Sequence, residues 1–166
     1  MRRTLETEDG VLVRGLRPED LAAVISLDAK NSGRRREEFF KVKLQQNLAE
    51  TGIKVSLAAE RDGIFCGFLL ARVYYGEFGS LEASAVLDTI DVDPGFQNQG
   101  VGRALLDQLC VNLRGLGVPT LRTEVEWSTP GLVAFFQREG FAPAPRICVE
   151  LDVAKRPRRD QREAAE

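Results

Sequence analysis

The feature that most constrains the fold is a strand–loop–helix junction in the second half of the chain. Residues 86–92 are rich in apolar and β-branched side chains, which predicts a buried strand. A short loop with Pro94 and Gly95 follows. The next segment, 101–114, carries leucine or valine at every fourth position, which predicts one buried helical face: Val101, Leu105, Leu109 and Leu113.

The start of this helix is expected to bind an anion. The first amide groups of a helix have no intrahelical acceptor, and the helix dipole adds positive potential there. Gly100 and Gly102 have no side chain to obstruct a phosphate. The surrounding polar side chains are Gln97, Asn98, Gln99 and Arg103. The alternative is that the two glycines serve only close packing of the helix on the sheet.

The loop differs from the two common phosphate-binding patterns. A P-loop has Gly-Lys-Ser/Thr at the start of its helix, whereas Gly102 is followed by Arg103 and Ala104. A dinucleotide fingerprint has a third glycine where this chain has Leu105.

The remaining pattern predicts one mixed α/β domain over residues 1–154, with an antiparallel first half and strand–helix–strand units in the second. The charged segment 155–166 has no apolar periodicity and is expected to be disordered. The other strands are expected at Val11–Val13, Val55–Glu60, Ile64–Tyr74, Thr120–Trp127 and Arg146–Leu151, and the other helices at about 17–30, 37–50 and 130–139.

Composition excludes several classes of chemistry. The chain of 166 residues contains no histidine, which excludes a Ser-His-Asp triad and a histidine-ligated metal. Its three cysteines are far apart in apolar runs, which is typical of buried thiols in a reducing cytoplasm. Proton transfer must therefore use carboxylates, Lys, Tyr, Cys or water, and we expect no metal.

Charge and hydropathy predict that the chain binds neither nucleic acid nor a membrane. The net charge is −2, so the chain as a whole does not attract polyanions. No run of about 18 apolar residues is present. The first six residues include three charges where a secretion signal needs an apolar core, which favours a cytoplasmic location.

Two motifs carry a family resemblance. Gln97-Asn98-Gln99-Gly100-Val101-Gly102 after a strand resembles the pyrophosphate-binding motif of the Gcn5-related N-acetyltransferase (GNAT) superfamily. Residues 132–141, a short helix ending in Gly140-Phe141, resemble that family's second motif, and the element order over 11–151 also fits. The resemblance implies a central mixed, mostly antiparallel sheet flanked by about four helices.

The resemblance also implies acetyl-CoA as co-substrate and acyl transfer to a primary amine in a ternary complex. The diphosphate is then expected on the loop amides, around Gln97, Asn98, Gln99, Gly100, Val101, Gly102 and Arg103. The pantetheine arm is expected to pair with the strand end, at Ile90, Asp91 and Val92. A β-bulge there should direct a backbone amide at the thioester oxygen.

The amine must lose a proton before it attacks, so a carboxylate base is expected. Glu124 is the first choice, because it aligns with the catalytic glutamate of bacterial enzymes that acetylate ribosomal-protein N-termini. Asp88, on the preceding strand, is the second. Both residues have a simpler interpretation, as a paired surface carboxylate and as a polar strand residue. Glu82, Asp91 and Glu126 are weaker alternatives.

One departure from the family concerns the proton donor to the departing thiolate. Many members have tyrosine in the second-motif helix, where this chain has Phe136. Replacements are Tyr74, Tyr75, Cys110 or water. The same departure supports an alternative function, a CoA-binding sensor or interaction module with little catalysis. The acceptor and the acyl length stay open, and a homodimer is an expectation because family members are often dimers.

Overall fold

The computed structural model describes residues 5–6, 10–49, 53–76, 79 and 81–156. It contains two compact units, Met1–Ser128 and Thr129–Glu166, which we describe separately. The single domain predicted over 1–154 stays a prediction. Most of the tail predicted to be disordered, 157–166, lies outside the described residues.

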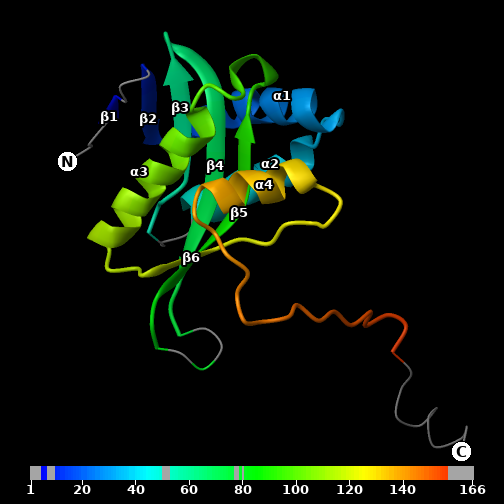
Figure 1. The fold of residues 1–166 in the computed structure, drawn as a ribbon. Helices are drawn as coiled ribbons and strands as arrows, with labels where there is room; N and C mark the ends of the chain where they lie inside the picture. Colours follow the sequence, from blue (N-terminus) through cyan, green and yellow to red (C-terminus); the bar gives the residue numbers. More distant parts are fainter. Residues whose placement is uncertain (1–4, 7–9, 50–52, 77–78, 80, 157–166) are drawn as a thin grey trace, which may run out of the picture. The chain divides into compact units, whose positions relative to one another are not determined.

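The first unit is built on a six-stranded sheet in the order β1-β2-β3-β4-β5-β6. Neighbouring strands are antiparallel except β5 and β6, which are parallel. This is the mixed, mostly antiparallel sheet that was expected (Figure 1). The strands are β1 (Leu5–Glu6), β2 (Val11–Gly15), β3 (Leu57–Arg61), β4 (Ile64–Tyr74), β5 (Ser84–Val92) and β6 (Thr120–Arg122).

Three helices cover the two faces of this sheet. They are α1 (Leu21–Ser32), α2 (Glu37–Ala49) and α3 (Val101–Gly115). Consecutive strand residues point to opposite faces. Phe68 of β4 packs in the cluster formed with α1 and α2, whereas the neighbouring Gly67 lies against α3. The α1–α2 layer and α3 therefore lie on opposite sides of β4 (Figure 1).

Both layers are held by buried apolar side chains. The α1–α2 face joins Phe68 and Leu70 to apolar residues of the two helices, which are Val24, Ile25, Leu27, Phe40, Leu44 and Leu48. The expected α3 stripe is confirmed, since Val101, Leu105, Leu109 and Leu113 are at most 3% exposed. Burial of this kind contributes about 25 cal/mol per Å² of apolar surface and fixes the positions of the elements around β5.

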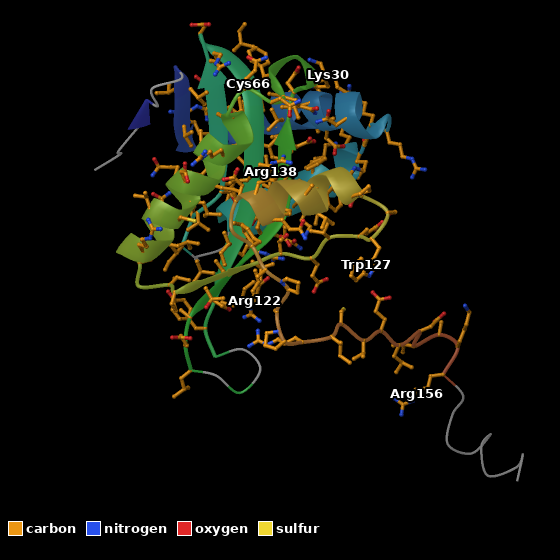
Figure 2. The ribbon with its side chains drawn as sticks, viewed as in Figure 1. Lys30, Cys66, Arg122, Trp127, Arg138 and Arg156 are labelled. Carbon is orange, nitrogen blue, oxygen red and sulfur yellow. The ribbon has the colours of Figure 1, made fainter. Side chains whose placement is uncertain are left out.

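Two sequence predictions in the first unit need correction. The strand expected over Thr120–Trp127 ends at Arg122, because β5 and β6 are paired over only three residues. The short strand β1 was not predicted, since two residues carry too little periodicity to be recognised. Trp127, beyond the end of β6, is 97% exposed (Figure 2).

The second unit contains α4 (Pro130–Arg138), the predicted helix with proline at its first position. The Phe136 ring contacts those of Phe135 and Phe141. The predicted strand Arg146–Leu151 is wrong for this structure, in which these residues form no strand. Its alternating side chains are exposed, Ile147 by 87% and Val149 by 81%. Strand preference reflects packing on neighbours, which this segment lacks.

The three cysteines differ in their exposure to solvent. Cys66 is buried and Cys110 half-buried, but Cys148 is exposed, so the expectation of three buried thiols fails at Cys148. Burial raises the pKa of the Cys66 thiol to about 11, which leaves it unreactive at neutral pH.

Within the described part of the chain, every helix is too short or too polar to cross a bilayer.

Candidate functional site

Strand β5 has two halves with different neighbours. Ser84, Ala85 and Val86 pair with β4 on one side and with β6 on the other. After Val86, β5 keeps its pairing with β4 up to Val92, but the described residues give it no further ladder to β6. The hydroxyl of Thr123 still donates to the Leu87 carbonyl at 2.9 Å. Beyond that point one edge of β5 is open to an extended chain.

A β-bulge marks the place where the two strands separate. Leu70 pairs with Thr89 and Ala71 with Leu87, so Asp88 is the extra residue on β5. The bulge expected at residues 90–92 therefore lies at Asp88, two residues after Val86, where the pairing with β6 ends. Asp88 is exposed as a residue although its side chain is only 19% exposed, so much of its exposed surface is backbone.

The loop after β5 is a compact turn that leads into α3. The Asp93 carboxylate accepts from the Gly95 amide at 2.9 Å, and its carbonyl accepts from the Phe96 amide at 2.8 Å. Two later residues have left-handed backbone, Asn98 with φ 59° and Gly100 with φ 82°. Gly100 caps α3, so the amides of the following three residues have no acceptor within the helix. The turn therefore presents backbone N–H groups where the sequence predicted an anion site.

Arg61, at the end of β3, holds one side of the loop. Its Nη1 donates to Oε1 of Gln99 at 2.6 Å, and its Nη2 donates to the Gln99 carbonyl at 3.1 Å. The Gln99 amide in turn donates to the Gly95 carbonyl at 2.9 Å. A guanidinium is thus fixed beside the expected phosphate site. The sequence analysis missed Arg61, which lies 38 residues from Gln99 and belongs to a hairpin rather than to a motif.

The last turn of α1 holds the other side of the loop. Lys30 Nζ lies 2.6 Å from a carboxylate oxygen of Asp93 and lowers the pKa of that carboxyl (Figure 2). The Asn31 amide donates to the Val92 carbonyl at 2.8 Å. The Gln97 amide donates to the same carbonyl at 3.1 Å and to Oδ1 of Asn31 at 3.3 Å. Gln97, expected at the diphosphate, therefore bonds back to the strand end.

Gly67 lets α3 approach the sheet closely behind the loop. A Cβ atom at Gly67 would lie 2.9 Å from Cγ1 of Val101, a distance that real Cβ atoms do not tolerate. It would also lie 3.2 Å from the Asp91 carbonyl. Because Val101 is the first residue of α3, the missing side chain at Gly67 sets how close the helix start lies to the end of β5. Close packing of α3 on the sheet, the alternative role of the loop glycines, therefore also depends on Gly67, which lies outside the loop.

Asp91 is a half-buried carboxylate near the end of β5, on the face of the sheet opposite α3. It pairs with Phe68 across the sheet and so faces the α1–α2 layer. The Asn31 amide donates to Oδ1 of Asp91. Burial raises the pKa of Asp91 to about 6, and the nearby Asp28 charge adds to this effect while Asn31 and Arg36 oppose it.

Asp88, one of the two expected bases, lies between two cations. Its carboxylate is 3.4 Å from Lys43 Nζ of α2 and 3.5 Å from a guanidinium nitrogen of Arg72 on β4. These contacts place the Asp88 side chain in the α1–α2 layer, next to the bulge that its own backbone forms. Two ammonium or guanidinium partners compete with an incoming amine for this carboxylate.

Glu124, the other expected base, lies two residues beyond the end of β6 and is exposed. In the parallel register Val86 is opposite Arg122, so continuing it by two residues would bring Glu124 level with Asp88. Glu124 and Asp88 therefore both follow, by two residues, the last pair of the β5–β6 ladder.

The remaining residues expected at the cofactor site or as proton donors lie on several different elements. Ile90, half-buried, pairs with Leu69. The Arg103 side chain is 72% exposed, 3.8 Å from Asp107. Tyr74 pairs with Ser84, at the far end of β5 from the loop, and Phe136 belongs to the second unit. Among the described residues, no group of three or more acidic or cysteine side chains could hold a metal ion.

Comparison with known proteins gives a family and several relatives. The model of the acetyltransferase (GNAT) family matches residues 21–141. The chain is 37% identical over 84 residues to the [ribosomal protein bS18]-alanine N-acetyltransferase of Escherichia coli K12, covering 51% of this chain and 52% of that protein. It is 37% identical over 86 residues to the mycothiol acetyltransferase of Propionibacterium freudenreichii, covering 46% and 28%. The chain spans at most about half the length of these curated relatives.

Solved structures show the same fold. The E. coli ribosomal-protein-S18-alanine N-acetyltransferase superposes with a TM-score of 0.66 at 28% identity, covering 81% of this chain and 79% of that one. The aminoglycoside N-acetyltransferase AAC(6')-Iy in complex with CoA gives 0.72 at 17% identity, covering 86% and 95%, a likeness of fold alone. Since the family model spans well over half of the residues, the chain belongs to the acetyltransferase (GNAT) family.

Proposed function

We propose that this protein transfers an acetyl group from acetyl-CoA to a primary amine of a small molecule or a protein. The observation that carries the proposal is the junction of three features on one strand. The second half of β5 has an open edge, a bulge exposes backbone at its start, and an amide-lined turn follows at its end. An extended, peptide-like arm with an anionic end fits that sequence of features.

The turn suits a diphosphate in both charge and shape. The helix start presents backbone N–H groups, and Gly100 and Gly102 leave the approach clear of side chains. From this turn the open edge of β5 runs back through Val92, Asp91 and Ile90 to the bulge. Acetyl-CoA would supply an activated acyl group at that bulge.

The carboxylates at the level of the bulge account for proton removal. An alkyl ammonium with a pKa near 10.4 must be deprotonated before its nitrogen attacks a carbonyl. We assign this role to Glu124, acting directly or through one water, because its carboxylate is exposed to solvent and to an incoming amine. Asp88, engaged by Lys43 and Arg72, is the second choice.

Backbone groups at the bulge account for stabilisation of the oxyanion. A bulge leaves one residue of a strand outside the regular ladder, so its amide is available to an external acceptor. Asp88 provides such a group at the position where the β5 edge becomes open. A preorganised N–H donor of this kind typically lowers the barrier for acyl transfer by about 3 kcal/mol.

The leaving thiolate can depart without a tyrosine donor. Phe136 has no proton to give, and Tyr74 pairs with the first residue of β5, four residues before the bulge. A thiol with a pKa near 8.5 leaves readily as a thiolate and takes its proton from water. Water is therefore the proton source that we favour among the open alternatives.

The relatives support an amine as acceptor but do not identify one molecule. The E. coli relative is named for the alanine of a ribosomal protein, the P. freudenreichii relative for mycothiol, and AAC(6')-Iy for aminoglycosides. Two of these three names specify N-acetylation. We propose the same for this protein. Acetyl as the acyl group and a cytoplasmic location remain predictions from the sequence.

The test is a thiol-release assay with acetyl-CoA and a panel of amines that includes a diamine, an aminoglycoside, an amino acid and peptides with free N-termini. Release that depends on one acceptor, with the acetylated product identified by mass, supports the proposal. CoA binding without release for any acceptor would instead support the sensor function suggested by Phe136. Absence of CoA binding would contradict both.

A further inference from the structure

Arg61 is a residue that no motif of this chain includes, yet it reaches the glycine loop. It is the last residue of β3 and pairs with Ile64, the first residue of β4, across the turn at Asp62–Gly63. From this hairpin its guanidinium extends to the loop that precedes α3. Two of its hydrogen bonds go to Gln99, at 2.6 Å to the side-chain oxygen and at 3.1 Å to the backbone carbonyl.

The position of Gln99 in the loop makes these contacts consequential. Gln99 lies between Asn98 and Gly100, the two loop residues with left-handed backbone. Asparagine adopts a left-handed conformation more readily than most residues with a side chain, but this region of backbone space is sparsely populated, so contacts that hold Gln99 also select the conformation of Asn98. Fixing both the side chain and the carbonyl of Gln99 restricts the backbone on either side of it. The amides from Gln99 onward then keep one direction.

The Gln99 side chain continues the connection across the turn. Its amide donates to the Gly95 carbonyl at 2.9 Å, and the Gly95 amide donates to the Asp93 side chain at 2.9 Å. The connection from Arg61 thus reaches the residue that follows β5. On the other side Asp93 is held by Lys30 of α1. The loop is therefore braced from the β3–β4 hairpin and from α1.

We infer that Arg61 is a positioning residue of the acyl-CoA site: acting through Gln99, it orders the loop so that the amides at the start of α3 converge on the diphosphate. This inference rests on the proposed function for the identity of the ligand. The ordering of the loop itself does not. A charged donor bonded to two acceptors on one residue gives the loop a single geometry before the ligand arrives.

The first test compares CoA affinity and turnover in Arg61→Met and Arg61→Lys. We expect the dissociation constant for CoA, and the KM for acetyl-CoA, to rise about 10-fold in Arg61→Met. We expect kcat to change less than twofold, because the chemical groups on β5 are untouched. Arg61→Lys, which keeps one donor, should recover part of the affinity. The matched control is Arg114→Met, an exposed arginine in the last turn of α3.

The second test asks whether Arg61 acts through Gln99. If it does, Arg61→Met should weaken CoA binding threefold or less when Gln99→Leu is already present, because the side-chain contact is then missing. An unchanged 10-fold loss in that background would mean that Arg61 acts on the ligand directly. That result, or a CoA affinity within twofold of wild type in Arg61→Met, overturns the inference.

The third test needs no ligand and separates the inference from the proposed function. In the free protein, amide hydrogen exchange of the peptide covering residues 97–103 should be faster in Arg61→Met than in wild type, with exchange in β4 unchanged. Equal exchange rates would contradict the inference even if CoA binds. Faster exchange in a protein that fails to bind CoA would support the ordering role and contradict the proposed ligand.

Discussion

The glycine loop and the carboxylate side of β5 are constructed in different ways. The loop offers backbone amides, and its geometry is held by hydrogen bonds from β3 and from α1. The three carboxylates near β5 are side chains in three different environments. Asp88 is ion-paired, Asp91 is half-buried, and Glu124 is exposed. Under the proposed function, CoA affinity would depend on how the loop backbone is held, whereas the rate of acetyl transfer would depend on the environment of a single carboxylate.

Replacing the assigned base should have the largest effect. We expect Glu124→Gln to lower kcat about 100-fold, because general-base assistance contributes on the order of 10²–10⁴. The KM for acetyl-CoA should stay within twofold, since the loop is unchanged. Steady-state thiol release with the accepted amine measures both constants.

The matched control for this variant is Glu38→Gln, an exposed glutamate on α2. Unchanged turnover in Glu124→Gln would move the base to Asp88 or to water. A matching fall in Asp88→Asn would then identify Asp88. A loss of CoA affinity in Glu124→Gln would break the separation between the two regions.

Blocking the loop should affect binding rather than chemistry. In Gly100→Val a β-branched side chain must adopt φ 82° and also covers the helix start. The strain alone amounts to about 1–3 kcal/mol, so we expect CoA affinity to fall about 10- to 100-fold, as measured by calorimetry. Gly117→Val carries a similar strain, at φ 70°, at the other end of α3 and should keep wild-type affinity. Normal affinity in Gly100→Val would show that the ligand does not use this loop.

Filling the space behind the loop should affect stability and binding together. Gly67→Ala places a Cβ 2.9 Å from Val101, so the start of α3 must shift. Overpacking of this kind costs about 1–3 kcal/mol in the free energy of unfolding, which a urea titration measures. We also expect a few-fold rise in the dissociation constant for CoA. Gly15→Ala, where a Cβ meets nothing within 4 Å, is the control. Equal stability of the two variants would contradict the close contact.

The half-buried acid should give the smallest effect, on the pH dependence of stability. Because burial raises the pKa of Asp91 to about 6 in the folded protein, from about 3.9 in an exposed aspartate, the folded state binds more protons between these values. Stability from this group is therefore present below pH 4 and is lost as pH rises to about 6. Asp91→Asn should raise the free energy of unfolding by about 1 kcal/mol at pH 7.5, with the gain shrinking toward pH 4. The control is the exposed Asp107→Asn, and a pH-independent difference would contradict the assignment.

The sequence predicted most elements of the first unit because their signals are local. Apolar spacing marked α3, and the two glycine-bounded runs around Asp62–Gly63 marked the β3–β4 hairpin. The loop was located for the same reason, since a strand, a turn and a helix start follow one another within a few residues. The family resemblance rested on the motif in that loop, on the second motif at residues 132–141 and on the order of the elements, and comparison confirmed the family.

The predictions that failed depended on neighbours that local patterns do not reveal. The strand expected through Trp127 ends at Arg122, because its ladder with β5 stops at the pair Val86 and Arg122. The alternating segment 146–151 forms no strand among the described residues, although its pattern is typical of one. The bulge lies at Asp88 rather than at 90–92 because register is a property of two strands together.

By itself the sequence determined where an anion could be bound, because backbone amides at a helix start are exposed whatever the surrounding fold. Only the tertiary structure decided what braces that turn and how each acid behaves. Arg61, Lys30 and Asn31 come to the loop from segments about 40 to 65 residues away, and the pKa of Asp91 is raised by burial that no local pattern encodes. Hydrogen bonds and desolvation act through space, so their partners are settled by packing.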